Sequence, residues 1–318
     1  MQRFFKNEKG SILVISAGAM LCLLILASAA IDVGCMLTAR NQLQCAVDAS
    51  ALAGATGLMV SHSEAITRAI TVAGRNDCIK QPVQINSGDI HFLNTNQVRV
   101  QANRNLSLFF AKAFGMDYTN ISAVAVAELG TIVGTKGMRP WAVPDMGWPT
   151  GAPVVLKAGS LGAPATNPSF FYPIDFPPLN RGTPISGASQ YRRNISYGSD
   201  CRVSIGDEIQ VEPGNMIGPT KQGVQELIAQ DPGAYWNGTC VVNSQFPGAS
   251  SPRIVKIPLY DPGLSADSGR NSITVIGLGS FFLIGLQGNN VIGVYMEKMT
   301  DGTFGNGYSF LKGTRLVL

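Results

Sequence analysis

The sequence predicts an α+β protein. An N-terminal transmembrane helix extends into a small helix-plus-sheet domain, and a Pro/Gly-rich, mostly β domain follows. Residues 10–31 contain no charged side chain, which predicts the transmembrane helix. Beyond Gly74 the apolar residues change from helical spacing to the alternation typical of strands. Of the 18 prolines, only Pro82 precedes Pro140. Because proline interrupts helices and sheet ladders, the C-terminal part must be rich in loops, with short strands.

These patterns divide the chain into four parts. We expect a cytoplasmic N-terminus at 1–10, a transmembrane helix at 11–33, a helix-plus-sheet domain at 34–130 and an exported β-rich domain at 131–318.

The composition argues against several classes of function. Charged residues make up 14% of the chain, where about a quarter is usual. The net charge of +4 is too small and too scattered to indicate a nucleic-acid partner. There are two histidines, His62 and His91, and neither CxxC nor HExxH occurs. We therefore predict no metal, no cofactor, no evident small-molecule substrate and no enzyme activity.

The membrane assignment rests on length and flanking charge. The 21 residues from Ser11 to Ile31 span about 30 Å as a helix, which matches the hydrocarbon core of a bilayer. The cations Arg3, Lys6 and Lys9 precede this run, so the positive-inside rule predicts a cytoplasmic N-terminus. The chain is then a single-pass protein of the inner membrane, with its C-terminal bulk outside the cytoplasm.

A cleavable signal peptide is the alternative interpretation. Residues 12–26 suit its apolar region, and Ala27-Ser28-Ala29 suits a cleavage site. Cleavage after Ala29 would release a secreted or surface-displayed adhesin or binding module. An exported hydrolase is a third possibility, for which the sequence offers no site.

The domain at 34–130 begins with a continuation of the helix. Leu43, Val47, Ser50 and Gly54 recur at helical spacing among alanines, which permits close approach of another helix. Residues 61–64 form a capping box for a second helix that ends near Gly74. The remaining elements expected here are strands at 89–93, 97–101 and 121–127, and a helix at 106–114 that Gly115 ends.

The domain at 131–318 offers strands and one helix. Strands are predicted at 153–157, 253–257, 273–277, 280–285 and 291–296, and a helix at 220–229. Cys201 and Cys240 both lie in this exported part, so they are candidates for a disulfide. Cys45–Cys78 is also possible, and free buried cysteines are an equal alternative for each pair.

The segment from Gly10 to Ala55 resembles the N-terminal region of Tad (Flp) pilus-assembly proteins of the TadE/TadG-like kind. The residues that carry the resemblance are Ala30-Ile31-Asp32-Val33-Gly34 and the run Leu43-Gln44-Cys45-Ala46-Val47-Asp48-Ala49-Ser50-Ala51-Leu52-Ala53-Gly54-Ala55. The resemblance implies a membrane-anchored structural component of the tight-adherence pilus system. Its implied partners are other pilus-assembly membrane proteins or pseudopilins, together with the lipid bilayer.

Two features depart from relatives of this kind. Gly10 is followed five residues later by Ile15, where a processed pilin would have glutamate. Residues 48–52 do not form the Asp-x-Ser-x-Ser metal site of a von Willebrand A domain.

Small residues on the helix are the candidate contact positions, because they let two backbones approach closely. The predicted helix-packing residues are Gly18, Ala27, Ala30, Gly34, Leu43, Val47, Ser50 and Gly54.

Overall fold

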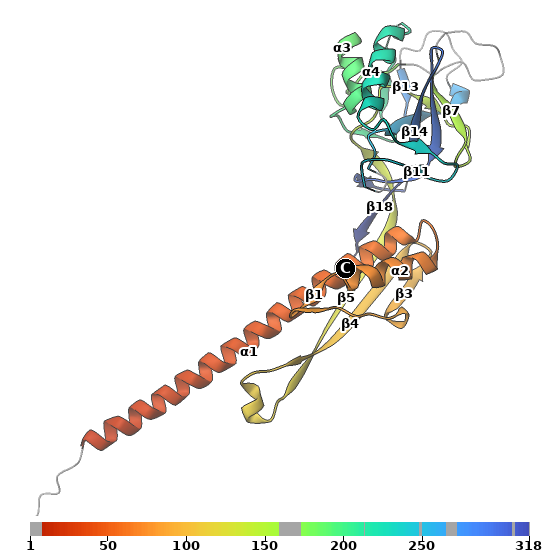
Figure 1. Cartoon of the computed structure of the whole chain (residues 1–318). Coiled ribbons are helices and arrows are strands. Elements are labelled where there is room, and N and C mark those ends of the chain that lie inside the picture. The colour runs from red at the N-terminus through yellow and green to blue at the C-terminus, as the bar shows by residue number, and fades with distance from the viewer. Residues whose placement is uncertain are drawn as a thin grey trace, which may run out of the picture. The chain divides into compact units, whose positions relative to one another are not determined.

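The computed structural model describes residues 8–158, 173–212, 214–247, 250–264, 272–306 and 309–317. Its chain divides into two compact units: Met1–Leu129 with Thr314–Leu318, and Gly130–Gly313. The first combines two helices with a sheet, and the second is mostly strands (Figure 1), so the predicted α+β class is confirmed. Residues 1–7 of the expected cytoplasmic N-terminus lie outside the described part.

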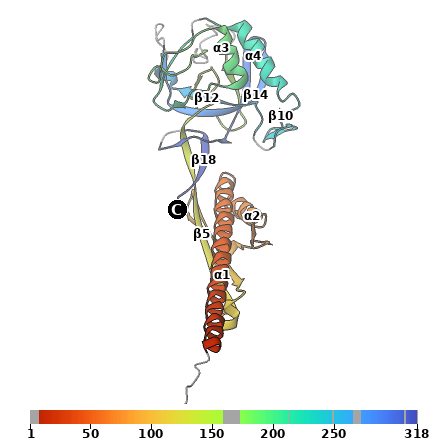
Figure 2. The same cartoon turned by 90° about the vertical axis from the view of Figure 1, so that its left-hand side faces the viewer.

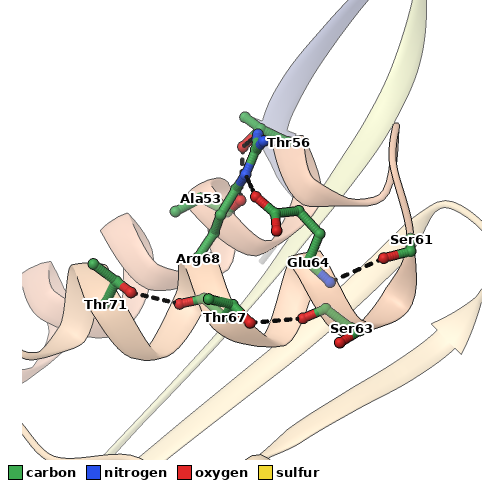
Figure 3. A network of polar contacts seen from close by, with 8 residues as sticks. All are labelled: Ala53, Thr56, Ser61, Ser63, Glu64, Thr67, Arg68 and Thr71. Carbon is green, nitrogen blue, oxygen red and sulfur yellow. Dashed lines mark hydrogen bonds and ion pairs between the residues drawn. The ribbon is translucent and has the colours of Figure 1, made fainter.

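The first unit is built on one long helix, α1 (Glu8–Gly57), so the predicted continuation beyond the apolar run is confirmed. A second helix, α2 (His62–Ala73), packs antiparallel to the end of α1 (Figure 1). The Ser61 side chain accepts a hydrogen bond from the Glu64 N–H at 3.1 Å, which is one half of the predicted capping box. The Ser61 N–H donates to the Gly57 carbonyl instead of the Glu64 side chain. Arg68 then pairs with Glu64 and donates to Thr56 of α1, which fastens the two helices together (Figure 3).

The sheet of the first unit lies against α1. Strands β3 (Ile90–Asn94) and β4 (Gln97–Ser107) form the predicted hairpin, and β4 pairs antiparallel with β5 (Tyr118–Thr135) from Gln97↔Glu128 to Ser107↔Tyr118. Alternate residues of β4 and β5 face the helix and are buried: Val98, Val100, Ala102, Leu106, Ile121, Ala123, Ala125 and Ala127. This alternation is the period-two pattern of a sheet with one covered face. Smaller elements are β1 (Asp77–Cys78), β2 (Gln81–Pro82) and η1 (Ser87–Asp89).

The prediction of a helix at 106–114 is wrong. Strand β4 continues to Ser107, and only a 3-10 turn, η2 (Ala111–Phe114), follows. Leu106 and Ser107 are part of the strand and not of a helix, because they pair with Thr119 and Tyr118 of β5. Gly115 does cap the turn in the left-handed region, with φ of 80°. The β4–β5 hairpin is therefore much longer than predicted, and it extends along α1 towards the N-terminal end of the helix (Figure 1, Figure 2).

The second unit contains a five-stranded sheet in the order β6-β12-β14-β15-β7. The bounds are Val143–Pro144 for β6, Pro153–Lys157 for β7, Ile254–Tyr260 for β12, Gly277–Gln287 for β14 and Asn290–Met296 for β15. The predicted strands at 153–157, 253–257, 280–285 and 291–296 are thus confirmed. The strand expected at 273–277 is divided between β13 (Ser272–Thr274) and β14, because the partner changes from β9 (Glu208–Gln210) to β12.

Two helices cover this sheet. Helix α4 (Ile217–Ala229) contains the predicted helix at 220–229, and α3 (Ala188–Tyr197) was not predicted. Tyr191 of α3 joins them to the core: its hydroxyl accepts from Trp141 Nε1 at 2.9 Å and lies 3.1 Å from Thr220 Oγ1 of α4. The remaining elements are β8 (Val203–Ser204), β10 (Tyr235–Trp236), β11 (Val241–Val242), η3 (Pro262–Leu264), β16 (Lys298–Met299), β17 (Thr303–Phe304) and β18 (Leu311–Leu316).

Candidate functional site: the membrane-spanning helix and its surroundings

The most apolar stretch of α1 is not buried by any part of the chain that the structure describes. Its most apolar 18-residue window has a mean hydropathy of 2.6, and none of that window is buried. Leu13 and Leu23, for example, are 72% and 67% exposed. A helix of the core of a soluble protein would bury such side chains against other elements. The exposed apolar helix therefore fits a single-pass membrane anchor.

Two serine hydroxyls in the apolar part of α1 are satisfied within the helix. The Ser28 hydroxyl donates to the Leu24 carbonyl at 2.6 Å, and Ser16 donates in the same way to Ile12. Every backbone or side-chain donor left unpaired in hydrocarbon costs several kcal/mol, so these internal bonds suit a lipid environment.

The predicted packing residues fall into two groups. Leu43, Val47, Ser50 and Gly54 are buried inside the chain's own core, where α1 meets α2 and the sheet. A Cβ added at Gly54 would lie 3.5 Å from the Ala69 Cβ and 3.3 Å from Val98 Cγ1. At this end of α1, the close approach that small residues permit is thus made within the chain, to α2 and β4.

The other four residues, Gly18, Ala27, Ala30 and Gly34, are exposed. Because an α-helix turns about 100° per residue, Ala27, Ala30 and Gly34 lie within about 60° of one another. Gly18 lies about 180° from Ala27, in the same direction as the buried Leu43 and Gly54. The three residues therefore form one strip, which faces away from the side of α1 that packs on the sheet, and Gly18 does not belong to it.

Asp32 joins α1 to the end of the β4–β5 hairpin. Its carboxylate, 6% exposed, accepts hydrogen bonds from the backbone N–H groups of Phe109 at 2.9 Å, Phe110 at 3.0 Å and Ala111 at 2.7 Å. The backbone dipoles of the turn compensate a charge that would otherwise be costly so close to the apolar run. From the sequence alone, Asp32 is one residue of the run 30–34, and no contact with the hairpin is predicted for it.

An apolar groove of about 360 Å³ lies beside this contact. One wall is the face of α1 from Ile25 to Met36, and the other comes from the hairpin end, with Leu108, Phe110, Met116 and Tyr118 among its residues. The groove thus opens next to the part of α1 that is expected in the membrane.

The six cysteines are free thiols in the structure. Cys201 is partly buried and Cys240 is exposed, and the disulfide between them stays a prediction. Cys78 is buried, and its Sγ donates to the Ala39 carbonyl of α1 at 3.3 Å. Burial also raises the pKa of the Cys78 thiol, which keeps it protonated.

Several charged groups of the second unit are buried. Burial lowers the pKa of Lys157 to about 8, and its Nζ donates to the carbonyl and side-chain oxygens of Asn215 at 2.6 and 2.7 Å. Burial and the neighbouring Glu212 carboxyl raise the pKa of Asp175 to about 7. Within the described ranges, no three or more His, Cys, Asp and Glu side chains gather as a metal site would require. These groups have structural partners, and we assign them no chemistry.

Comparison with known proteins gives one match. Residues 10–57 match the Tad family model, which describes Flp pilus-assembly proteins of the TadE/G-like kind. Neither the curated proteins nor the solved structures give a significant match. The matched segment covers the apolar helix, Asp32, the exposed strip and the buried Leu43–Gly54 face. The chain therefore carries a Tad TadE/G-like segment at residues 10–57, and this segment together with the exposed apolar helix fits a pilus-related membrane component.

Proposed function

We propose that this chain is a structural component of Tad (Flp) pilus assembly that acts through helix packing and protein–protein contacts, without catalysis. Residues 11–33 cross the inner membrane once, and residues 1–10 lie in the cytoplasm. The helix-plus-sheet domain at 34–130 and the β-rich domain at 131–318 lie outside. The observation that carries the proposal is the uncovered apolar helix within the segment that matches the pilus-assembly family.

The basic N-terminal flank supports this orientation, because positive charge is retained on the cytoplasmic side. Two measurements test it on the full-length chain. Carbonate washing of membrane vesicles should leave the protein in the pellet, and a reporter fused to the C-terminus should be active outside the cytoplasm only. Release by carbonate, or a reporter facing the cytosol, would reject the proposal.

The strip formed by Ala27, Ala30 and Gly34 is the surface that we assign to a partner helix. Lipid chains are as apolar as leucine, so helices associate in a bilayer where small residues allow close packing. The partners are other pilus-assembly membrane proteins or pseudopilins. Crosslinking to them should weaken in an Ala30→Leu/Gly34→Leu variant and stay unchanged in the matched Gly18→Leu variant, which alters the opposite face. Equal crosslinking in both variants would exclude the strip.

The mature N-terminus distinguishes an anchored protein from a secreted binding module. Mass spectrometry that finds Ala30 as the first residue would mean cleavage after Ala29 and a secreted product. A first residue at or before Ser11 would mean that the helix is retained. Retention is favoured by the groove, since cleavage after Ala29 would remove Ile25, Ser28 and Ala29 from its wall.

A further inference from the structure

The end of the β4–β5 hairpin, residues 108–118, is called the hairpin tip below. It exposes four large apolar or aromatic side chains: Phe109 at 70%, Phe110 at 44%, Met116 at 58% and Tyr118 at 68%. Such a cluster on one short turn is unusual for a surface in water and marks an interaction site. The tip lies beside α1 and ends towards its apolar part (Figure 1, Figure 2).

We propose that the hairpin tip inserts into the lipid interface of the bilayer that α1 crosses, on the side where the folded units lie. The chain then touches the membrane twice, once with a spanning helix and once with an interfacial turn. This inference rests on the proposed membrane anchoring. Its occupant is lipid, because the tip's apolar surface is continuous through the groove with the lipid-facing surface of α1.

The position of the tip along α1 fits insertion to the depth of the lipid interface. The groove reaches from Asp32, where the tip is bonded to the helix, back to Ile25. Seven residues of α-helix correspond to about 10 Å. Interfacial segments bury their apolar face about 5–10 Å into the boundary between headgroups and acyl chains. The two lengths agree if the helix leaves the hydrocarbon near Asp32, as the end of its charge-free stretch indicates.

Most backbone N–H groups of the tip are hydrogen-bonded, as a membrane environment requires. Irregular backbone enters a membrane only where its polar groups are satisfied by protein or water. The Asp32 carboxylate accepts hydrogen bonds from the N–H groups of Phe109, Phe110 and Ala111. Within the turn, the N–H groups of Ala113 and Gly115 donate to the carbonyls of Phe110 and Lys112, and the Met116 N–H donates to the Ala111 carbonyl. The turn thus exposes apolar side chains while most of its donors remain bonded.

The polar residues of the tip suit the headgroup layer. Tyrosine concentrates at membrane interfaces, where its ring is in the apolar layer and its hydroxyl in water. Lys112 Nζ lies 6.0 Å from the centre of the Tyr118 ring, and its long stem can carry the charge up to the lipid phosphates. Asp117 is exposed at the base of the tip, next to β5, where the headgroup region is hydrated.

Quenching by brominated lipid tests the proposal on the full-length protein in vesicles of phosphatidylcholine and phosphatidylglycerol. Phe109→Trp adds a reporter to the tip, and Tyr118→Trp serves as a second variant. Met20→Trp reports on the spanning helix, and Leu93→Trp reports on an exposed position near the end of β3. Emission is compared with the unaltered protein, which supplies the background of the three native tryptophans.

The tip variants should lose emission, most strongly when the bromines lie near the headgroup end of the acyl chain. Met20→Trp should be quenched most by bromines deeper in the bilayer, and Leu93→Trp should not be quenched. Quenching of Met20→Trp without quenching of either tip variant would overturn the tip inference and leave the anchor intact. Equal quenching of Leu93→Trp and the tip variants would also overturn it. If Met20→Trp is not quenched, the result rejects the proposed membrane anchoring, on which the inference about the hairpin tip rests.

Discussion

Replacing Asp32 by asparagine is expected to loosen the hairpin tip from α1. The nearly buried carboxylate accepts three backbone N–H groups from the tip. A hydrogen bond to a charged group contributes roughly 1.5–3 kcal/mol, and a buried N–H without an acceptor costs about 1–3 kcal/mol. Asparagine offers one neutral acceptor oxygen in place of two charged ones. At least one N–H then loses its acceptor, so we expect the contact to weaken by about 3 kcal/mol.

Hydrogen exchange with mass spectrometry measures this change in the full-length protein in detergent micelles. Because every 1.4 kcal/mol is about a tenfold change in an equilibrium, a loss of about 3 kcal/mol predicts roughly hundredfold faster exchange in the peptide that contains Phe109, Phe110 and Ala111. The matched control is Asp117→Asn, which removes an exposed carboxylate from the same hairpin. Exchange that is equally slow in Asp32→Asn and the unaltered protein would refute the reasoning.

Three further substitutions test the packing and the buried charges, each by unfolding the full-length protein in detergent. Gly54→Leu should destabilise the first unit by about 1–3 kcal/mol, because Val98 and Ala69 fill the space, whereas Gly18→Leu should leave it unchanged. Asp175 keeps its proton up to about pH 7 when folded but only to its ordinary pKa of 3.8 when unfolded, so the free energy of unfolding should fall from pH 4 to pH 7. Asp175→Asn should remove that part of the decline; an unaltered pH profile would contradict the raised pKa. Arg253→Met should lower the stability of the second unit by about 3 kcal/mol or more, because four backbone carbonyls lose the guanidinium that bonds them, and full stability would contradict this structural role.

The elements that the sequence predicted well are those specified by local patterns. The N-cap at Ser61 fixes the start of α2, because Ser61 and the Glu64 N–H that it binds belong to the same turn. The alternation along β4 and β5 predicts strands, because one face of each is covered by α1. Helix α3 was missed, since its polar sequence has only Tyr191 and Ile195 as large buried apolar residues.

The contacts of the candidate site could not be predicted in the same way. Asp32 and Phe109 are separated by 77 positions, and no spacing rule connects a carboxylate to N–H groups at that distance. Periodicity also identifies the Leu43–Gly54 face of α1 as a packing face without telling whether the partner is the same chain or another. The structure answers that question for this face, because its neighbours are α2 and the sheet.

The uninterrupted course of α1 has a mechanical consequence. One helix of 50 residues, about 75 Å long, begins just before the apolar run and ends in the core of the first unit. Because α1 is continuous over this length, a tilt or twist imposed on its apolar end is transmitted through the helix to the end that packs in the first unit. In the proposed topology, force from a moving neighbour in the bilayer would thereby reach the side outside the cytoplasm without a flexible joint to absorb it.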